Sequence, residues 1–246
     1  MSERYWRRPM PMAAVLLAAA GAAALTGCGT SAGSGAASST ATAGLAANAG
    51  QAEPAGFTAT QLQGALLGTI NGASPAAPTE AGAYGALPDV QTSKASLRGV
   101  TVTPAKCAQA TVTGFNSATF AKAPASVVTF RVGRDGVSEV IVAASPQTAQ
   151  SALSSRLPDG CAHYKATVDG KTFSYSVKEM AASGIADQAR ALNVKAAGYA
   201  DVDVWSVVYR GSGFVGAVTI VGPNASEQGA KVLAAQAYKR AVESLH

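Results

Sequence analysis

Three pairs of strand-like segments constrain the fold of this chain more than any other feature of its sequence. Each pair is rich in β-branched and aromatic residues, and each is interrupted by residues that suit a tight turn. The interruptions are Asp135-Gly136, Asp169-Gly170 and the glycines at 211 and 213. These residues tolerate the positive φ angles of short hairpin turns. The pattern predicts an antiparallel β-sheet of about six strands, formed by hairpins.

Helix signals flank and separate these hairpins. Thr60 can cap a first helix, and Ser145 followed by Pro146 is typical of a helix start, with an apolar face that continues to a stop at Asp159-Gly160. Asn224 and Glu227 have capping-box spacing before a final apolar stripe. Helices packed on an antiparallel sheet make an α+β domain, either a two-layer or a three-layer sandwich.

The stretch from Gly211 to Val218 matches the glycine spacing of nucleotide-binding loops. A dinucleotide-binding loop opens a helix whose amides face the pyrophosphate, whereas this stretch leads into a strand. A kinase glycine loop would also need a downstream lysine and catalytic aspartates, which do not follow. The glycines therefore predict a turn, with Gly216 at a close contact or a bulge, and no cofactor is predicted.

The N-terminal segment resembles the signal peptide of a bacterial lipoprotein. Arg4, Arg7 and Arg8 precede an apolar stretch from Met12 to Leu25, and the sequence LTGC then ends at Cys28. An uncleaved transmembrane helix is the alternative, but this stretch is shorter than the ~20 residues that span a bilayer. We predict a signal peptide at 1–27 and lipidation of Cys28, as palmitate or a related acyl group, which anchors the protein to the extracytoplasmic face of the cell membrane.

Residues 28–56 are predicted to be a disordered tether that follows the lipid anchor. Gly, Ser, Ala and Thr dominate this segment, so it lacks the large apolar side chains that would offset the entropy of ordering. Residues 57–246 then form a single domain. Of 19 basic and 14 acidic residues, three basic and one acidic residue precede Cys28. Because the remaining basic excess is small and scattered, no nucleic-acid partner is predicted.

Cys107 and Cys161 remain once Cys28 is acylated. An even pair of cysteines in an exported domain predicts a disulfide bond. The alternative is a metal site or a reactive thiol that includes His163, but Cys161 and His163 lack a second cluster with zinc spacing. No metal site is predicted.

Catalysis would require residues that this chain offers in few places. The two histidines, His163 and His246, lie beside the predicted disulfide and at the C-terminus. Asp201 and Asp203 form a carboxylate pair that would share a strand face with Trp205 and Tyr209, which is the basis for an alternative function as an envelope glycan hydrolase. We assign no catalytic residue, and we predict a ligand cleft near Asp203, Trp205 and Tyr209.

The order of these elements is similar to the PknH-like extracellular sensor domain. The resemblance rests on the cysteine positions, on GIADQA at 184–189 and on VVYRGSGFVG at 207–216. This family includes actinobacterial lipoproteins and the outer domains of some receptor Ser/Thr kinases. The resemblance implies an α/β sandwich with a ligand cleft and no catalysis, although the kinase sensors have two disulfides and this domain has cysteines for one.

A non-catalytic, sensor-like binding domain for a small ligand or an envelope protein is the function that we expect. A structural surface lipoprotein without a ligand is a further alternative.

Overall fold

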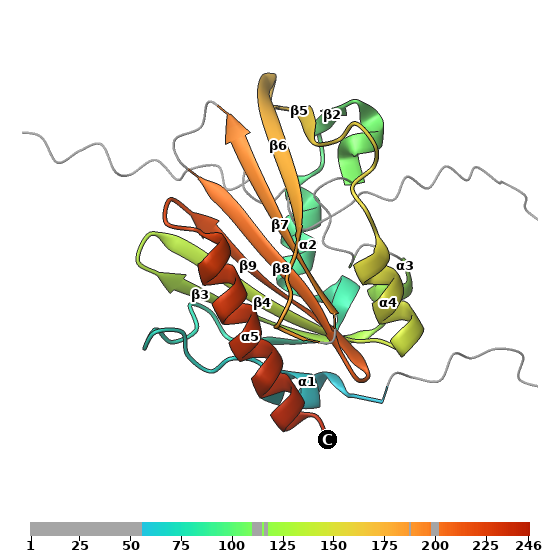
Figure 1. Cartoon of the computed structure of the whole chain (residues 1–246), viewed down its shortest axis with the longest axis vertical. Coiled ribbons are helices and arrows are strands. Elements are labelled where there is room, and N and C mark those ends of the chain that lie inside the picture. The colour runs from blue at the N-terminus through green and yellow to red at the C-terminus, as the bar shows by residue number, and fades with distance from the viewer. Residues whose placement is uncertain (1–55, 110–114, 116–117, 187, 198–201) are drawn as a thin grey trace, which may run out of the picture. The chain divides into compact units, whose positions relative to one another are not determined.

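The computed structural model describes residues 56–109, 115, 118–186, 188–197 and 202–246 (Figure 1). The signal peptide, Cys28, the tether up to residue 55 and Asp201 lie outside the described residues, so the predictions made for them stay predictions. In the part that is described, no helix is both long and apolar enough to span a membrane.

Nine strands form one antiparallel sheet in the order β1-β3-β4-β9-β8-β7-β6-β5-β2. They are β1 (Glu80–Ala83), β2 (Thr101–Thr103), β3 (Pro124–Val132), β4 (Asp135–Ala143), β5 (His163–Val168), β6 (Lys171–Ala181), β7 (Gln188–Ala197), β8 (Asp203–Gly211) and β9 (Phe214–Gly222). The α+β class is confirmed, and the predicted number of about six strands was too low. The three hairpins supply six strands, while β1, β2 and β7 are additional.

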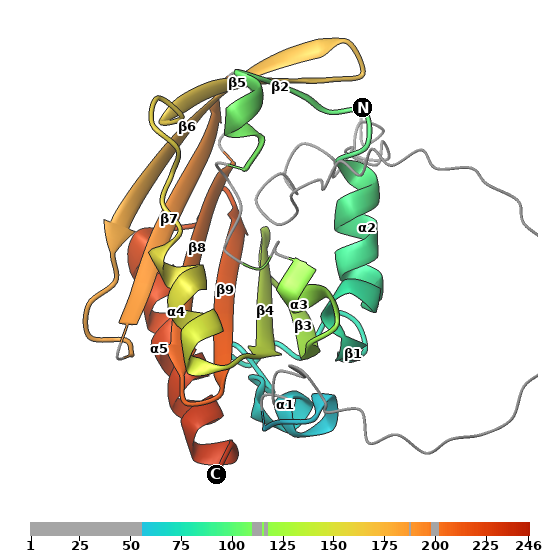
Figure 2. The same cartoon turned by 90° about the vertical axis from the view of Figure 1, so that its right-hand side faces the viewer.

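Helices pack on both sides of the sheet, which makes three layers (Figure 2). The α-helices are α1 (Ala59–Ala65), α2 (Pro88–Ser96), α3 (Ala118–Ala121), α4 (Pro146–Ser154) and α5 (Glu227–Ser244), and two 3-10 helices are η3 (Tyr84–Ala86) and η4 (Ala105–Gln109). One side, here called the α5 face, packs against α1 and α5. The other side, the α4 face, packs against α2, α3 and α4 near β3 and β4, and against η4 near β5 and β6.

The predicted turns hold in two hairpins and shift in the third. Asp169 and Gly170 have φ angles of 48° and 74° and join β5 to β6, as expected. In the β3–β4 hairpin, however, Val132 pairs with Asp135, so that the two-residue turn is Gly133-Arg134. Asp135 is buried, and its carboxylate accepts a hydrogen bond from the amide of Asn224 (3.0 Å). Asp135-Gly136 therefore belongs to β4 and not to the turn. The hydrogen bond from Asn224 joins Asp135 to the segment that follows β9.

One predicted helix cap is correct, and two are displaced by two residues. Ser145 caps α4 as predicted, but α4 ends at Ser154 rather than at Asp159. Thr58, not Thr60, caps α1 and forms a capping box with Gln61. Ser226, not Asn224, caps α5. In each case the cap is a hydroxyl whose oxygen accepts from the backbone three residues later, which is the usual geometry.

Candidate functional site

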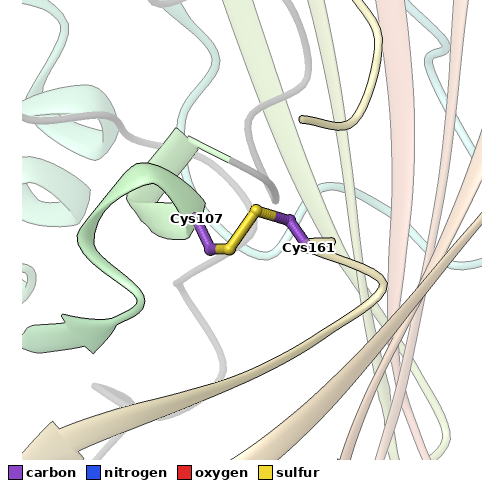
Figure 3. Close-up of a disulfide and its surroundings, with 2 residues drawn as sticks. All are labelled: Cys107 and Cys161. Atoms are coloured by element: carbon purple, nitrogen blue, oxygen red, sulfur yellow. A yellow bond between two sulfur atoms is a disulfide. The ribbon is translucent and has the colours of Figure 1, made fainter. Parts of the chain in front are cut away.

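The predicted disulfide is present and lies at the β5 end of the α4 face (Figure 3). Cys107 and Cys161 are both buried, with their Cα atoms 5.3 Å apart. Cys107 belongs to η4, while Cys161 comes shortly before β5. The bond therefore joins η4 to the sheet, in an apolar cluster that includes Tyr164 and Tyr175.

The glycine stretch that begins at Gly211 contains the turn between β8 and β9. Gly211 pairs with Phe214, which leaves Ser212 and Gly213 as the turn residues, and Gly213 has a φ angle of 82°. Gly216 lies opposite Tyr209, and a Cβ atom at Gly216 would come within 2.5 Å of the Tyr209 ring. The glycine at 216 is thus explained by close packing with an aromatic ring.

The residues of the predicted cleft share one face of β8 but differ in accessibility. Asp203, Trp205 and Tyr209 lie on the α5 face, as expected from their alternation. Tyr209 is fully buried, whereas Trp205 is half-buried, and the Asp203 carboxylate lies 3.0 Å from the Lys195 ammonium. A ligand cleft here stays a prediction, and a ligand at this place would meet Trp205 and Asp203 rather than Tyr209.

A row of hydroxyl side chains crosses the opposite, α4 face of the sheet. Thr129 pairs with Ser138, Ser138 with Thr219, and Thr219 with Ser206. Directly paired residues of an antiparallel sheet point to the same side, so the four hydroxyl groups share this face. We call these four residues the hydroxyl row.

The hydroxyl row separates two apolar clusters on the α4 face. One cluster packs against α2, α3 and α4, and the other surrounds the disulfide. Thr129, Ser138 and Thr219 are half-buried, while Ser206 is 1% exposed and its hydroxyl lies 2.9 Å from that of Thr219. Central strands are usually apolar, so a row of hydroxyl groups here is unusual. Its half-buried hydroxyl groups offer hydrogen-bond donors and acceptors to a bound molecule.

The hydroxyl row has no activated nucleophile in its register. Continuing along the same row, Ser206 pairs with Leu192, and Leu192 pairs with Glu179. The Glu179 carboxylate already has partners: the Arg190 guanidinium lies 3.2 Å from it, and the backbone amide of Leu157 donates a hydrogen bond to it at 3.1 Å. Among the described residues, no cluster of His, Cys, Asp or Glu has the arrangement of a metal site. The arrangement suits binding through hydrogen bonds.

Glu139, a carboxyl group with a strongly perturbed pKa, lies on the other side of the sheet. Glu139 of β4 is 1% exposed on the α5 face. Burial raises the pKa of Glu139 to about 7, although the amide of Leu67 (2.8 Å) and the charge of Arg240 act in the opposite direction. Burial and the nearby Glu139 charge also raise the pKa of Tyr209.

Glu139 and Arg240 hold the end of α1 from two sides. Arg240 of α5 donates hydrogen bonds to the carbonyls of Leu66 and Gly64, the latter at 3.1 Å. The second carboxylate oxygen of Glu139 and the Tyr209 hydroxyl are buried without a hydrogen-bond partner among the residues that the structure describes. This cluster is buried beneath two helices and therefore belongs to the core.

Neither the hydroxyl row nor the Glu139 cluster was predicted from the sequence. The row depends on the register of three strand pairs, which no local pattern contains. Glu139 follows strict alternation with Val137 and Ile141 on the apolar side of β4, and that position was the only available sign of a buried carboxylate.

Comparison with solved structures shows that the fold is PknH-like. The crystal structure of the extracellular domain of PknH from Mycobacterium tuberculosis matches with a TM-score of 0.55 and 14% identity, covering 76% of this chain and 97% of that domain. A putative uncharacterized protein from Mycobacterium smegmatis, an Rv0999 ortholog, matches with a TM-score of 0.37 and 14% identity, covering 58% and 76%. No family model and no curated protein matches the chain.

Proposed function

We propose that this chain is a lipid-anchored, extracytoplasmic binding protein that recognises a small ligand or an envelope protein without catalysis. The observation that carries the proposal is the shared fold with a domain described as extracellular, combined with an internal disulfide. Disulfides persist in oxidising compartments outside the cytoplasm. The lipobox at Cys28 supplies the anchor in this proposal.

The hydroxyl row is the place at which we expect the ligand to bind. It combines half-buried hydroxyl groups with apolar clusters on both sides, which is the usual composition of a small-molecule site. The side chains of the hydroxyl row are neutral donors and acceptors, which favours an uncharged polar ligand. The vicinity of Trp205 and Asp203 is the second candidate position.

A thermal-shift screen of uncharged cell-envelope metabolites tests this proposal, because a ligand that prefers the folded state raises the melting temperature. We expect the shift to disappear in the double variant Ser206→Ala/Thr219→Val. The matched control is Thr167→Val/Thr172→Val, which removes a second cross-strand hydroxyl pair, also at 2.9 Å. If the ligand-induced rise in melting temperature were lost only in the control variant, or only in Trp205→Phe, the ligand would not bind at the hydroxyl row.

Further measurements test the alternatives and the anchor. Cleavage of envelope glycans that is lost in Asp201→Asn/Asp203→Asn, with the fold intact, would establish a hydrolase instead. A structural role without a ligand predicts that no metabolite shifts the melting temperature. Intact-mass analysis of the membrane fraction tests the anchor, because removal of residues 1–27 and acylation of Cys28 both change the mass.

A further inference from the structure

Part of the α5 face has no helix over it among the residues that the structure describes. Helix α5 runs along β8 and β9, and Figures 1 and 2 show no described helix over β5 and β6 on this side of the sheet. The side chains exposed there include Lys165 of β5, Lys178 of β6 and Lys195 of β7. We call this surface, defined by the three lysines, the basic face.

The strand register shows that the three lysines belong to one surface. Lys165 pairs with Ser174, Ser176 pairs with Lys195, and Lys178 pairs with Asn193. Positions 174, 176 and 178 alternate along β6, so they share the α5 face. Because adjacent strands are about 4.8 Å apart, the lysine Cα atoms lie within roughly 15 Å of one another on three neighbouring strands.

Positive charge dominates the basic face. Among the described residues on this part of the sheet, Asp203 is the only acidic side chain on the same side, since Glu179 points to the α4 face. Asp203 contacts Lys195 at 3.0 Å, yet the Lys195 side chain stays 56% exposed. Exposed ion pairs of this kind are weak, so Lys195 remains available to an anionic partner.

Trp205 borders the basic face where the face meets α5. It lies on β8 opposite Asn193, which in turn lies opposite Lys178, and its side chain is half-buried. Tryptophan is enriched at the boundary between lipid and water, because its ring is apolar and its N–H group is polar. Lysines beside such a ring are typical of surfaces that contact anionic lipid headgroups.

We propose that the basic face docks on an anionic lipid bilayer, with Trp205 at the headgroup level. The surface carries three lysines on neighbouring strands and a tryptophan at its border, a combination that suits an anionic lipid surface. Docking of this kind rests on the proposed lipid anchor: a chain held at a membrane through its N-terminal segment has a high effective concentration of lipid, so that a weak docking surface is sufficient. Each lysine near an anionic bilayer shifts the docking equilibrium by about fivefold, and three shift it by about 100-fold.

The tryptophan content of the chain allows a direct test. The chain has two tryptophans, Trp6 and Trp205, so the Trp6→Phe variant leaves Trp205 as the single reporter. The full chain is bound to vesicles that contain brominated lipids, and the quenching of Trp205 fluorescence reports its distance from the lipid. Because Trp6 is replaced, insertion of the N-terminal segment into the vesicle gives no tryptophan signal of its own, and the quenching reports the position of the domain.

We expect strong quenching on vesicles that contain phosphatidylglycerol, weak quenching on pure phosphatidylcholine, and loss of quenching at high salt. Lys165→Gln/Lys178→Gln/Lys195→Gln should shift the docking equilibrium by about 100-fold toward the undocked state. Lys94→Gln/Lys106→Gln/Lys122→Gln is the control with the same change in net charge, and it should dock as the unmodified chain does.

Three results would overturn the proposal. Equal quenching on both vesicle types would show that charge is not involved. Equal loss in both triple variants would assign the effect to net charge instead of the basic face. Absence of quenching on phosphatidylglycerol vesicles, while the basic-face lysines bind soluble heparin, would assign the surface to an anionic polymer.

Discussion

Replacing Glu139 by glutamine should change the pH dependence of folding stability in a defined direction. Glutamine has nearly the same shape as glutamate, and its carbonyl oxygen can still accept the amide of Leu67, which lies 2.8 Å from the carboxylate. The substitution removes the buried charge and leaves the contacts of α1 and β4 in place. It therefore isolates the cost of ionising one carboxyl group under two helices.

The size of the effect follows from the pKa of Glu139, which burial raises from 4.5 to about 7. Since the folded pKa is the higher one, the folded state binds more protons than the unfolded state between these two values. The free energy of unfolding therefore falls as pH rises through this window, and the loss is complete above the folded pKa. At 1.36 kcal/mol per unit of pKa, ionisation of Glu139 costs about 3 kcal/mol of stability.

Urea unfolding at pH 5 and pH 8 measures this cost. The stability of the unmodified chain should fall between the two pH values by about 3 kcal/mol more than that of Glu139→Gln. The two proteins should be similar at pH 5, and the glutamine variant should be the more stable at pH 8. Because all other titratable groups are common to both proteins, their contributions cancel in the comparison. Parallel stability profiles between pH 5 and pH 8 would refute the reasoning.

Three other substitutions test the packing. Gly216→Ala should destabilise the domain by about 2 kcal/mol in urea unfolding, because its Cβ would overlap the Tyr209 ring. Gly68→Ala is the control, since no atom lies within 4 Å of a Cβ at that position. Equal losses of stability in the two variants would contradict the overlap. Tyr209→Phe should stabilise the domain by about 1 kcal/mol, since it removes a buried hydroxyl without a described partner, and a marked loss of stability would reveal a hidden hydrogen bond. Cys107→Ser/Cys161→Ser should cost about 4 kcal/mol for a 54-residue separation, and an unchanged melting temperature would show that the bond is dispensable.

The hairpins were predictable from the sequence because their signals are local. Asp169-Gly170 and Gly213 adopt the positive φ angles that their residue types permit, and alternation along β8 correctly placed Asp203, Trp205 and Tyr209 on one face. The β3–β4 turn was misplaced because Asp135-Gly136 has the same local signal, while the buried contact between Asp135 and Asn224 is a tertiary one.

The additional strands could not be predicted from local patterns. Strand β7, with the sequence QARALNVKAA, contains helix-favouring Ala, Leu, Lys and Arg, and it becomes a strand because it pairs with β6 and β8 on its two sides. Strands β1 and β2 are four and three residues long and lie at the two sheet edges. Segments as short as these have no distinctive period.

The candidate sites were less predictable than the fold. A sequence shows that Thr219 and Ser138 belong to strands, but only the pairing of β4 with β9 makes them neighbours. The same applies to Lys178 and Lys195, whose proximity depends on the register of β6 with β7. Trp205 was identified because a large aromatic residue in a strand is conspicuous by itself.

The attachment of α1 determines how the domain would respond to mechanical load. A pull on the chain before Phe57 reaches α1 first, and α1 is held by the burial of Leu62 and Ala65 in the core and by the hydrogen bonds of Glu139 and Arg240 at its end. These side-chain contacts would yield under tension before the strand ladders, whose hydrogen bonds share the force. Stretching the protein from its N-terminal side should therefore release a short segment at low force and leave the sheet intact.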